Sequence, residues 1–98
     1  MHWVVAEATA TAAALHQATA DSSYADWYAT WWQHIDDHFR DPVHGSWHHE
    51  LAPDLTPSST TWEGKPDTYH AYQATLLPRL PLAPTLARAL ADGIQPTP

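Results

Sequence analysis

Hydrophobic positions in the first 40 residues recur at helical spacing and predict two helices. Residues 2–18 are rich in alanine, the strongest helix former, and place small or apolar residues on one side. Residues 23–39 follow an i, i+3, i+4, i+7 pattern that is carried by Tyr24, Trp27, Tyr28, Trp31, Trp32, Ile35 and Phe39. We interpret Trp27, Trp31 and Ile35 as core residues. Because only a short turn separates the two helices, we expect them to pack as an antiparallel hairpin.

Proline and short polar residues interrupt this pattern after residue 39. Pro42 ends the second helix because proline cannot continue it. Alternation over residues 46–51 predicts a short extended stretch, and the turn-forming residues 52–61 predict a loop.

Two further helices are predicted in the last third of the chain. The first covers residues 66–77, with Pro66 at its first position and Asp67 in its first turn, where the helix dipole favours a negative charge. The second covers residues 84–91, and a frayed tail follows over 94–98. The sequence therefore predicts an all-α unit, residues 1–98, with a short strand-like excursion.

Composition and charge argue against some classes of binding partner. Apolar residues make up 44% of the 98 residues and six are tryptophan, which is typical of a globular chain. The net charge is −7 with only four Lys and Arg residues, which argues against nucleic acid and anionic membranes as partners. No apolar run is long enough to span a membrane, and residues 1–20 do not have the pattern of a secretory signal, so we expect a cytoplasmic location.

Eight histidines invite a metal-site interpretation, which the spacing does not favour. His34, Asp37, His38 and Asp41 fall on one helix face, but an acidic face near a helix end is usually a solvated one. His48 and His49 are adjacent on an extended stretch and point to opposite sides. There is no cysteine, nucleophile motif or glycine-rich phosphate loop. We therefore expect neither a metal nor another cofactor.

The most informative stretch surrounds His70. Helical spacing puts it on one face with Ala74 and Leu77, where a packed, hydrogen-bonded histidine is the ordinary interpretation. However, the run Gly-Lys-Pro-Asp-Thr-Tyr-His-Ala-Tyr-Gln-Ala-Thr-Leu-Leu-Pro-Arg-Leu-Pro-Leu, residues 64–82, resembles the C-terminal signature of the N-acylglucosamine 2-epimerase family. It is most similar to the mannose isomerase and sulfoquinovose isomerase branch.

This resemblance implies a fold and a set of site residues. The fold would be the C-terminal helical hairpins of an (α/α)6 barrel, and His70 would be one of two acid–base histidines. The opening residues 1–8 resemble a late helix of the family whose tryptophan and glutamate line the sugar pocket, which assigns Trp3 and Glu7 to substrate binding. Trp3 and Glu7 are four residues apart and so share a helix face. His2 is a weaker candidate for the same pocket.

The implied reaction moves a proton at a carbon next to the sugar carbonyl, through a cis-enediol. Histidine suits this reaction because its reference pKa is about 6.5. The leading hypothesis is that the chain forms part of an aldose–ketose isomerase of mannose/fructose type. One alternative is a 2-epimerase of N-acylglucosamine or of disaccharides, and another is a non-catalytic helical interaction module. The partner histidine of the family lies outside the resembling stretch. We therefore expect the isolated chain to be inactive and to self-associate through exposed apolar surface.

Overall fold

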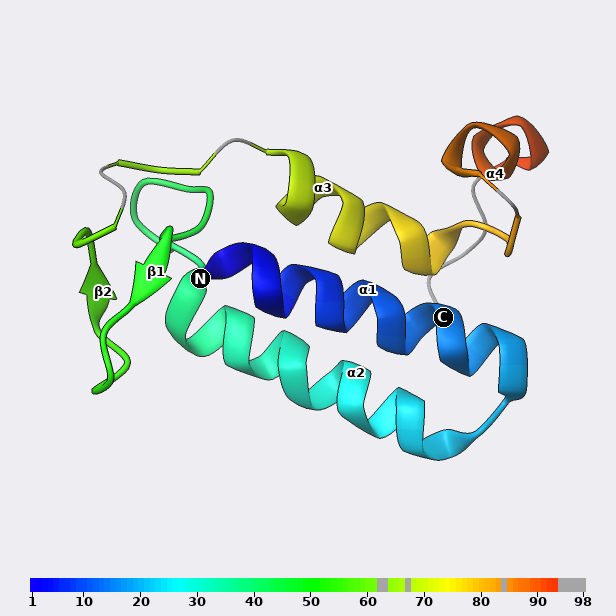
Figure 1. Cartoon of the computed structure of the whole chain (residues 1–98), viewed down its shortest axis with the longest axis horizontal. Helices are drawn as coiled ribbons and strands as arrows, with labels where there is room; N and C mark the ends of the chain where they lie inside the picture. The colour runs from blue at the N-terminus through cyan, green and yellow to red at the C-terminus, as the bar shows by residue number, and fades with distance from the viewer. Residues whose placement is uncertain (62–63, 67, 84, 94–98) are drawn as a thin grey trace.

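The computed structural model describes residues 1–61, 64–66, 68–83 and 85–93, and it is built around one central helix. Helix α1 (His2–Thr19) lies between α2 (Ser22–His34) and α3 (Tyr69–Leu76), as Figure 1 shows. The α2 helix runs antiparallel to α1, whereas α3 runs parallel to it. The predicted all-α class and the predicted helical hairpin are thus confirmed.

Local chemistry explains the tight turn between α1 and α2. Ala20 adopts a left-handed conformation (φ 59°), and its N–H donates to the His16 carbonyl, which closes the end of α1. Asp21 then caps α2 by accepting a hydrogen bond from the Ser23 N–H at 2.9 Å. The turn is therefore too short for α2 to do anything but fold back along α1.

The second predicted helix changes character before it ends. Residues Ile35–Phe39 form a π-helix, η1, in which the Arg40 N–H donates to the Ile35 carbonyl at 2.8 Å. The prediction of one α-helix to residue 39 was therefore wrong over its last turn. A hydrophobic pattern does not distinguish the two forms here, because both bury the pair Ile35 and Phe39, which are 0% and 4% exposed.

The core is smaller than the aromatic stripe suggested. Its buried members come from α1, η1, the following loop and α3, namely Ala6, Ile35, Phe39, Trp47 and Ala74. Ile35 is a core residue as predicted, but the prediction for Trp27 was wrong, because Trp27 is 52% exposed. Its ring stacks on that of Trp31, which is itself only partly buried, with centroids 5.2 Å apart, and both rings line an open groove between α1 and α2. The aromatic residues therefore cover a wider arc of α2 than the packing of α1 buries.

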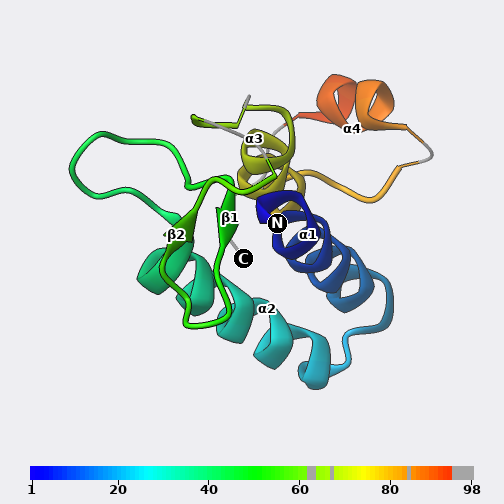
Figure 2. The ribbon, with the colours of Figure 1, turned by 60° about the vertical axis from the view of Figure 1, so that its left-hand side comes forward.

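The excursion after η1 is a small β-hairpin. Strand β1 (Glu50–Leu51) pairs antiparallel with β2 (Pro57–Ser58), so the strand-like stretch is shorter than predicted and the predicted loop contains a second strand. A buried carboxylate orders the polar segment, since Glu50 accepts a hydrogen bond from the Thr61 N–H at 2.7 Å. The hairpin lies at the end of the molecule where α1 begins, as Figures 1 and 2 show.

The motif helix α3 begins later than predicted and ends at Leu76, one residue before the predicted end. It starts at Tyr69, and Pro66 is buried in the segment before it. Past Leu76 the chain continues as a 3₁₀-helix, η2 (Leu77–Arg79), which includes Pro78 because the first turn of a new helix needs no N–H there. The prediction for Asp67 lies outside the described residues.

The last helix, α4 (Leu86–Asp92), is capped by Thr85, whose hydroxyl accepts a hydrogen bond from the Arg88 N–H. Residue 84, where this helix was predicted to start, and the predicted tail over 94–98 lie outside the described residues. No helix of the described residues combines the length and the apolar character needed to cross a membrane.

Candidate active site

A carboxylate and a histidine meet across the interface of α1 and α3. Glu7 lies in the second turn of α1 and His70 in the first turn of α3, and Glu7 Oε1 is 2.7 Å from His70 Nδ1. Because a carboxylate only accepts hydrogen bonds, Nδ1 carries the hydrogen and donates it. The remaining ring nitrogen, Nε2, is then the one that can accept a proton when the imidazole is neutral.

Small residues allow the two helices to come this close. Ala6 on α1 and Ala74 on α3 are 1% and 0% exposed and belong to the same core cluster. Farther along the parallel pair, the Gln17 side-chain amide donates to the Pro78 carbonyl at 3.2 Å. The register of α3 on α1 is therefore fixed at both ends, and it sets Glu7 opposite His70.

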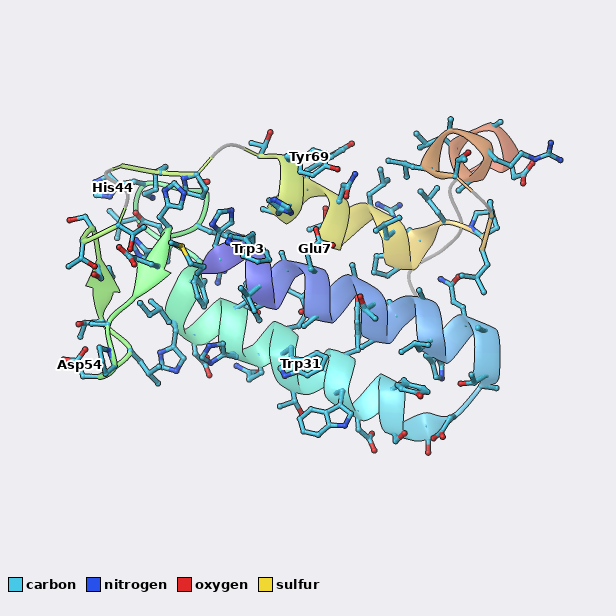
Figure 3. All side chains as sticks on the ribbon, viewed as in Figure 1. Trp3, Glu7, Trp31, His44, Asp54 and Tyr69 are labelled. Atoms are coloured by element: carbon cyan, nitrogen blue, oxygen red, sulfur yellow. The ribbon has the colours of Figure 1, made fainter. Side chains whose placement is uncertain are left out.

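Trp3 joins this pair from one turn earlier on α1. The ring centroids of Trp3 and His70 are 6.2 Å apart and the planes are tilted by 40°. In Figure 3, Trp3 and Glu7 point from α1 toward α3. The side chains of Glu7 and His70 are 49% and 31% exposed, and Trp3 is 47% exposed. The three residues selected from the sequence thus share one accessible surface.

Two further histidines line up behind His70. The His2 ring is 4% exposed and stands edge-on to His70, with centroids 5.9 Å apart, and to His49, with centroids 5.0 Å apart. The His2 N–H also donates to the His49 carbonyl at 2.8 Å, which ties the start of α1 to the segment before β1. His2 therefore lies within the site but is too buried to reach its surface.

Sequence reasoning did not select Tyr69 or His49 for the site. The Tyr69 ring is 4.9 Å from the His70 ring in an edge-on arrangement and is 60% exposed. In the sequence, only its place directly before His70 could have pointed to Tyr69. His49 had no signal, because its approach to His2 depends on how the excursion folds back.

An ion pair anchors the segment that leads into α3. Lys65 Nζ is 2.7 Å from Asp41 Oδ2 and 2.8 Å from the Gly45 carbonyl. Asp41 also accepts hydrogen bonds from the N–H groups of Val43 and His44, at 2.9 and 3.0 Å. The hydrogen bond from Lys65, followed by those from His44 and Val43, holds the pKa of Asp41 well below its usual range.

The residues considered above as candidate metal ligands either bind another side chain or are not grouped around one point. Asp41 is engaged by Lys65, and the His34 and His38 rings stand 5.0 Å apart on the α2–η1 helix. Within residues 1–61, 64–66, 68–83 and 85–93, no group of three or more His, Asp or Glu side chains is arranged to hold a metal ion.

Comparison with known proteins decides the family. A model of the N-acylglucosamine 2-epimerase family matches residues 1–74, three quarters of the chain. The chain belongs to this family. That membership agrees with the resemblance seen in the sequence, and the match includes Trp3, Glu7 and His70.

Two relatives within the family are named D-mannose isomerase. One, from Thermobifida fusca, is 64% identical over 92 residues, which are 93% of this chain and 23% of the relative. Another, from Pseudomonas cannabina pv. alisalensis, is 56% identical over 91 residues, which are 93% of this chain and 22% of the relative. The chain therefore spans less than a quarter of the length of these curated relatives.

Proposed function

We propose that the chain forms part of the active site of a sugar isomerase and that His70 is its acid–base residue. The observation that carries the proposal is the 2.7 Å contact between Glu7 Oε1 and His70 Nδ1. A carboxylate held on one ring nitrogen fixes the tautomer and the ring orientation and leaves Nε2 to exchange a proton with substrate. In this proposal Glu7 acts mainly by orienting His70, and Trp3 provides an apolar face for the sugar ring.

The chemistry proposed for His70 is a proton shuttle between neighbouring carbons. In the open-chain aldose, Nε2 removes the hydrogen of C2 as a proton, and the C–H electron pair forms the C1–C2 double bond. The carbonyl oxygen at C1 gains the negative charge, which gives an enediolate. While it is on Nε2 the proton can exchange with solvent; His70 then returns a proton to C1, the O2–H proton moves to O1, and a ketose carbonyl forms at C2. No external oxidant or reductant is needed, since the reaction is an internal transfer.

The proposed substrate pair is mannose and fructose, because the relatives are named D-mannose isomerase. A 2-epimerase would use the same first step but would return the proton to the opposite face of C2. That outcome needs a second acid on the other side of the sugar. We propose that any such group, like the rest of the pocket, comes from residues beyond these 98, and that the chain provides the last hairpins of an (α/α)6 barrel.

The test uses a chimera, because we expect the 98 residues alone to be inactive. The matching segment of the Thermobifida fusca enzyme is replaced by this chain, which is 64% identical to it. We expect the chimera to convert mannose to fructose and to exchange the C2 hydrogen with solvent deuterium. Replacing His70 by Asn in the chimera should lower kcat by about 10²–10⁴, the usual loss for a positioned acid or base, with little change in KM.

A matched control separates catalysis from folding. His16→Asn makes the same chemical change in the last turn of α1, away from His70 and from Asp41, and it should leave kcat unchanged. Circular dichroism and thermal unfolding would show that both variants are folded. A His70→Asn chimera that still exchanged the C2 hydrogen at the parent rate would refute the assignment. Glucose as the main product from mannose would favour the epimerase alternative.

A specific observation supports a second candidate role, that of an interaction surface. The outer side of the α1–α2 hairpin carries an apolar groove, and Val4, Leu15 and Trp27 on this side are 51%, 38% and 52% exposed. Contiguous apolar surface of this kind favours association. We propose that the isolated chain self-associates through this groove. Analytical ultracentrifugation should show a concentration-dependent increase in mass that Leu15→Glu and Trp27→Glu together abolish, and a monomer at high concentration would exclude it.

A further inference from the structure

The segment that precedes α3 is held by contacts with residues outside that helix. Thr68, at the N-terminal boundary of α3, makes no side-chain hydrogen bond to the helix, so the usual cap is missing. The Tyr72 N–H donates to the Thr68 carbonyl at 2.8 Å, at the start of the helix. A short helix whose boundary residue gives no side-chain cap frays easily at its first turn, and this turn carries His70.

The turn to which Lys65 is bound is itself rigid. The Asp41 N–H donates to the Ser46 carbonyl at 2.9 Å, and the Gly45 N–H donates back to the Asp41 carbonyl at 3.0 Å. On both sides this turn is continuous with core residues, since Phe39 precedes it and Trp47 follows it, with 4% and 7% exposure. Residues 41–46 therefore form a fixed platform, whose position is marked by His44 in Figure 3.

Lys65 connects that platform to the helix start. Its ammonium group bonds both the Asp41 carboxylate and the Gly45 carbonyl, and the next residue, Pro66, is buried. The Asp41 side chain is only 8% exposed, so its negative charge depends on nearby donors for compensation: Lys65, two backbone N–H groups and the His44 ring, whose Nδ1 is 3.4 Å from Oδ2. Only four residues separate Lys65 from His70, so holding Lys65 limits how far the first turn of α3 can move.

We propose that Lys65 and Asp41 form a clasp that positions His70 for acid–base chemistry. This inference rests on the proposed function of His70. Lys65 touches neither His70 nor the sugar surface, so it is a positioning residue. Glu7 holds the His70 ring from α1, and the clasp holds the backbone that carries the ring. Loss of the clasp should let the first turn of α3 open and the Glu7–His70 hydrogen bond break with it.

The first experiment uses nuclear magnetic resonance on the 98-residue chain and needs no activity. In the parent chain, ¹⁵N chemical shifts of His70 should show the tautomer with hydrogen on Nδ1. Lys65→Met should produce a mixture of tautomers and speed amide hydrogen exchange at Tyr72 by at least about fivefold, because the first turn opens more often. Asp41→Asn should do the same, since its amide oxygen still accepts from the backbone but carries no charge for Lys65.

Two variants show that the effect belongs to the clasp. Lys65→Arg retains a cation at this position and should restore most of the Nδ1–H tautomer. Arg40→Met removes a neighbouring exposed ion pair, Arg40 with Asp36, and should change neither readout. A Lys65→Met chain with the parent tautomer and the parent exchange rate at Tyr72 would overturn the inference.

The chimera with the Thermobifida fusca enzyme links the clasp to turnover. Lys65→Met should lower kcat about tenfold with little change in KM, since small misplacement of a reacting group lowers rate more than binding. An active chimera whose kcat is insensitive to Lys65→Met would overturn the positioning role. An inactive parent chimera would instead count against the proposed function, and the resonance experiment would still decide whether the clasp orders His70.

Discussion

The contact between Glu7 and His70 should have a measurable coupling free energy in the isolated chain. The perturbation is a double-mutant cycle with Glu7→Ala, His70→Ala and the double variant, which removes each partner without adding new hydrogen bonds. A hydrogen bond to a charged group contributes about 1.5–3 kcal/mol when it is sheltered, whereas an exposed ion pair contributes about 0–1 kcal/mol. The two side chains are 49% and 31% exposed, between these limits but nearer the exposed one. We therefore expect a coupling of about 1 kcal/mol.

Urea unfolding followed by circular dichroism at pH 7 and low salt gives the four free energies of unfolding. The coupling should fall to less than half its value in 1 M NaCl, where the Debye length is only about 3 Å. The control cycle pairs Glu7→Ala with His16→Ala, which lies nine residues away on α1, or roughly 13 Å along the helix. That cycle should show additivity within about 0.3–0.5 kcal/mol. A Glu7–His70 coupling no larger than the control, with all variants folded, would refute the reasoning.

Three other predictions concern the fold around the site. Ile35→Ala should lower the free energy of unfolding by about 2–4 kcal/mol because Ile35 is fully buried, whereas Trp27→Ala, at a 52% exposed position, should cost less than about 1 kcal/mol; equal losses in urea unfolding would contradict the core described above. Ala74→Leu should destabilise the chain by about 1–3 kcal/mol, since Ala74 is 0% exposed against α1, and Tyr72→Leu on the exposed side of α3 serves as its control. Acid should lower the free energy of unfolding through Asp41. The folded state lowers the pKa of Asp41, so between that pKa and the unfolded value of about 3.9 the unfolded state binds more protons. Stability therefore falls as the pH falls through this range. Asp41→Asn should flatten this part of the pH profile, and an unchanged slope below pH 4 would show that Asp41 does not contribute.

The elements that could be predicted are those that depend on local pattern. The hairpin of α1 and α2 follows from alanine content, aromatic spacing and a short turn with an aspartate cap. The grouping of Trp3 and Glu7 follows from their separation of four residues. Their approach to His70 could not be derived from spacing, because it depends on a packing contact 63 residues apart in the chain. The resemblance to a family supplied that step.

The errors arise where tertiary contacts decide the outcome. Trp27 has the periodicity of a core residue, but its ring lines the open groove between α1 and α2, so it lies at the surface. Pro57 and Ser58 have no strand propensity, yet they pair with β1 because the turn at residues 52–56 returns the chain in register. No role for Lys65 followed from the sequence, because its partner Asp41 lies 24 residues earlier and was grouped with the acidic residues of a helix end.

The parallel arrangement of α1 and α3 has a consequence for the order of folding. Two parallel neighbours need a long connection, and here Glu7 and His70 are 63 residues apart in the chain. Closing a loop of that length costs roughly 1.5 kcal/mol more conformational entropy than closing a loop of about ten residues, and only two residues, Ala20 and Asp21, join α1 to α2. The hairpin of α1 and α2 should therefore form first, and α3 should dock last. By the same argument α3 should open before the α1–α2 hairpin in the native state, so the surface proposed to be catalytic is assembled at a less stable edge of the chain. Native-state hydrogen exchange should find lower opening free energies in α3 than in α1, and equal values would mean that the three helices unfold as one unit.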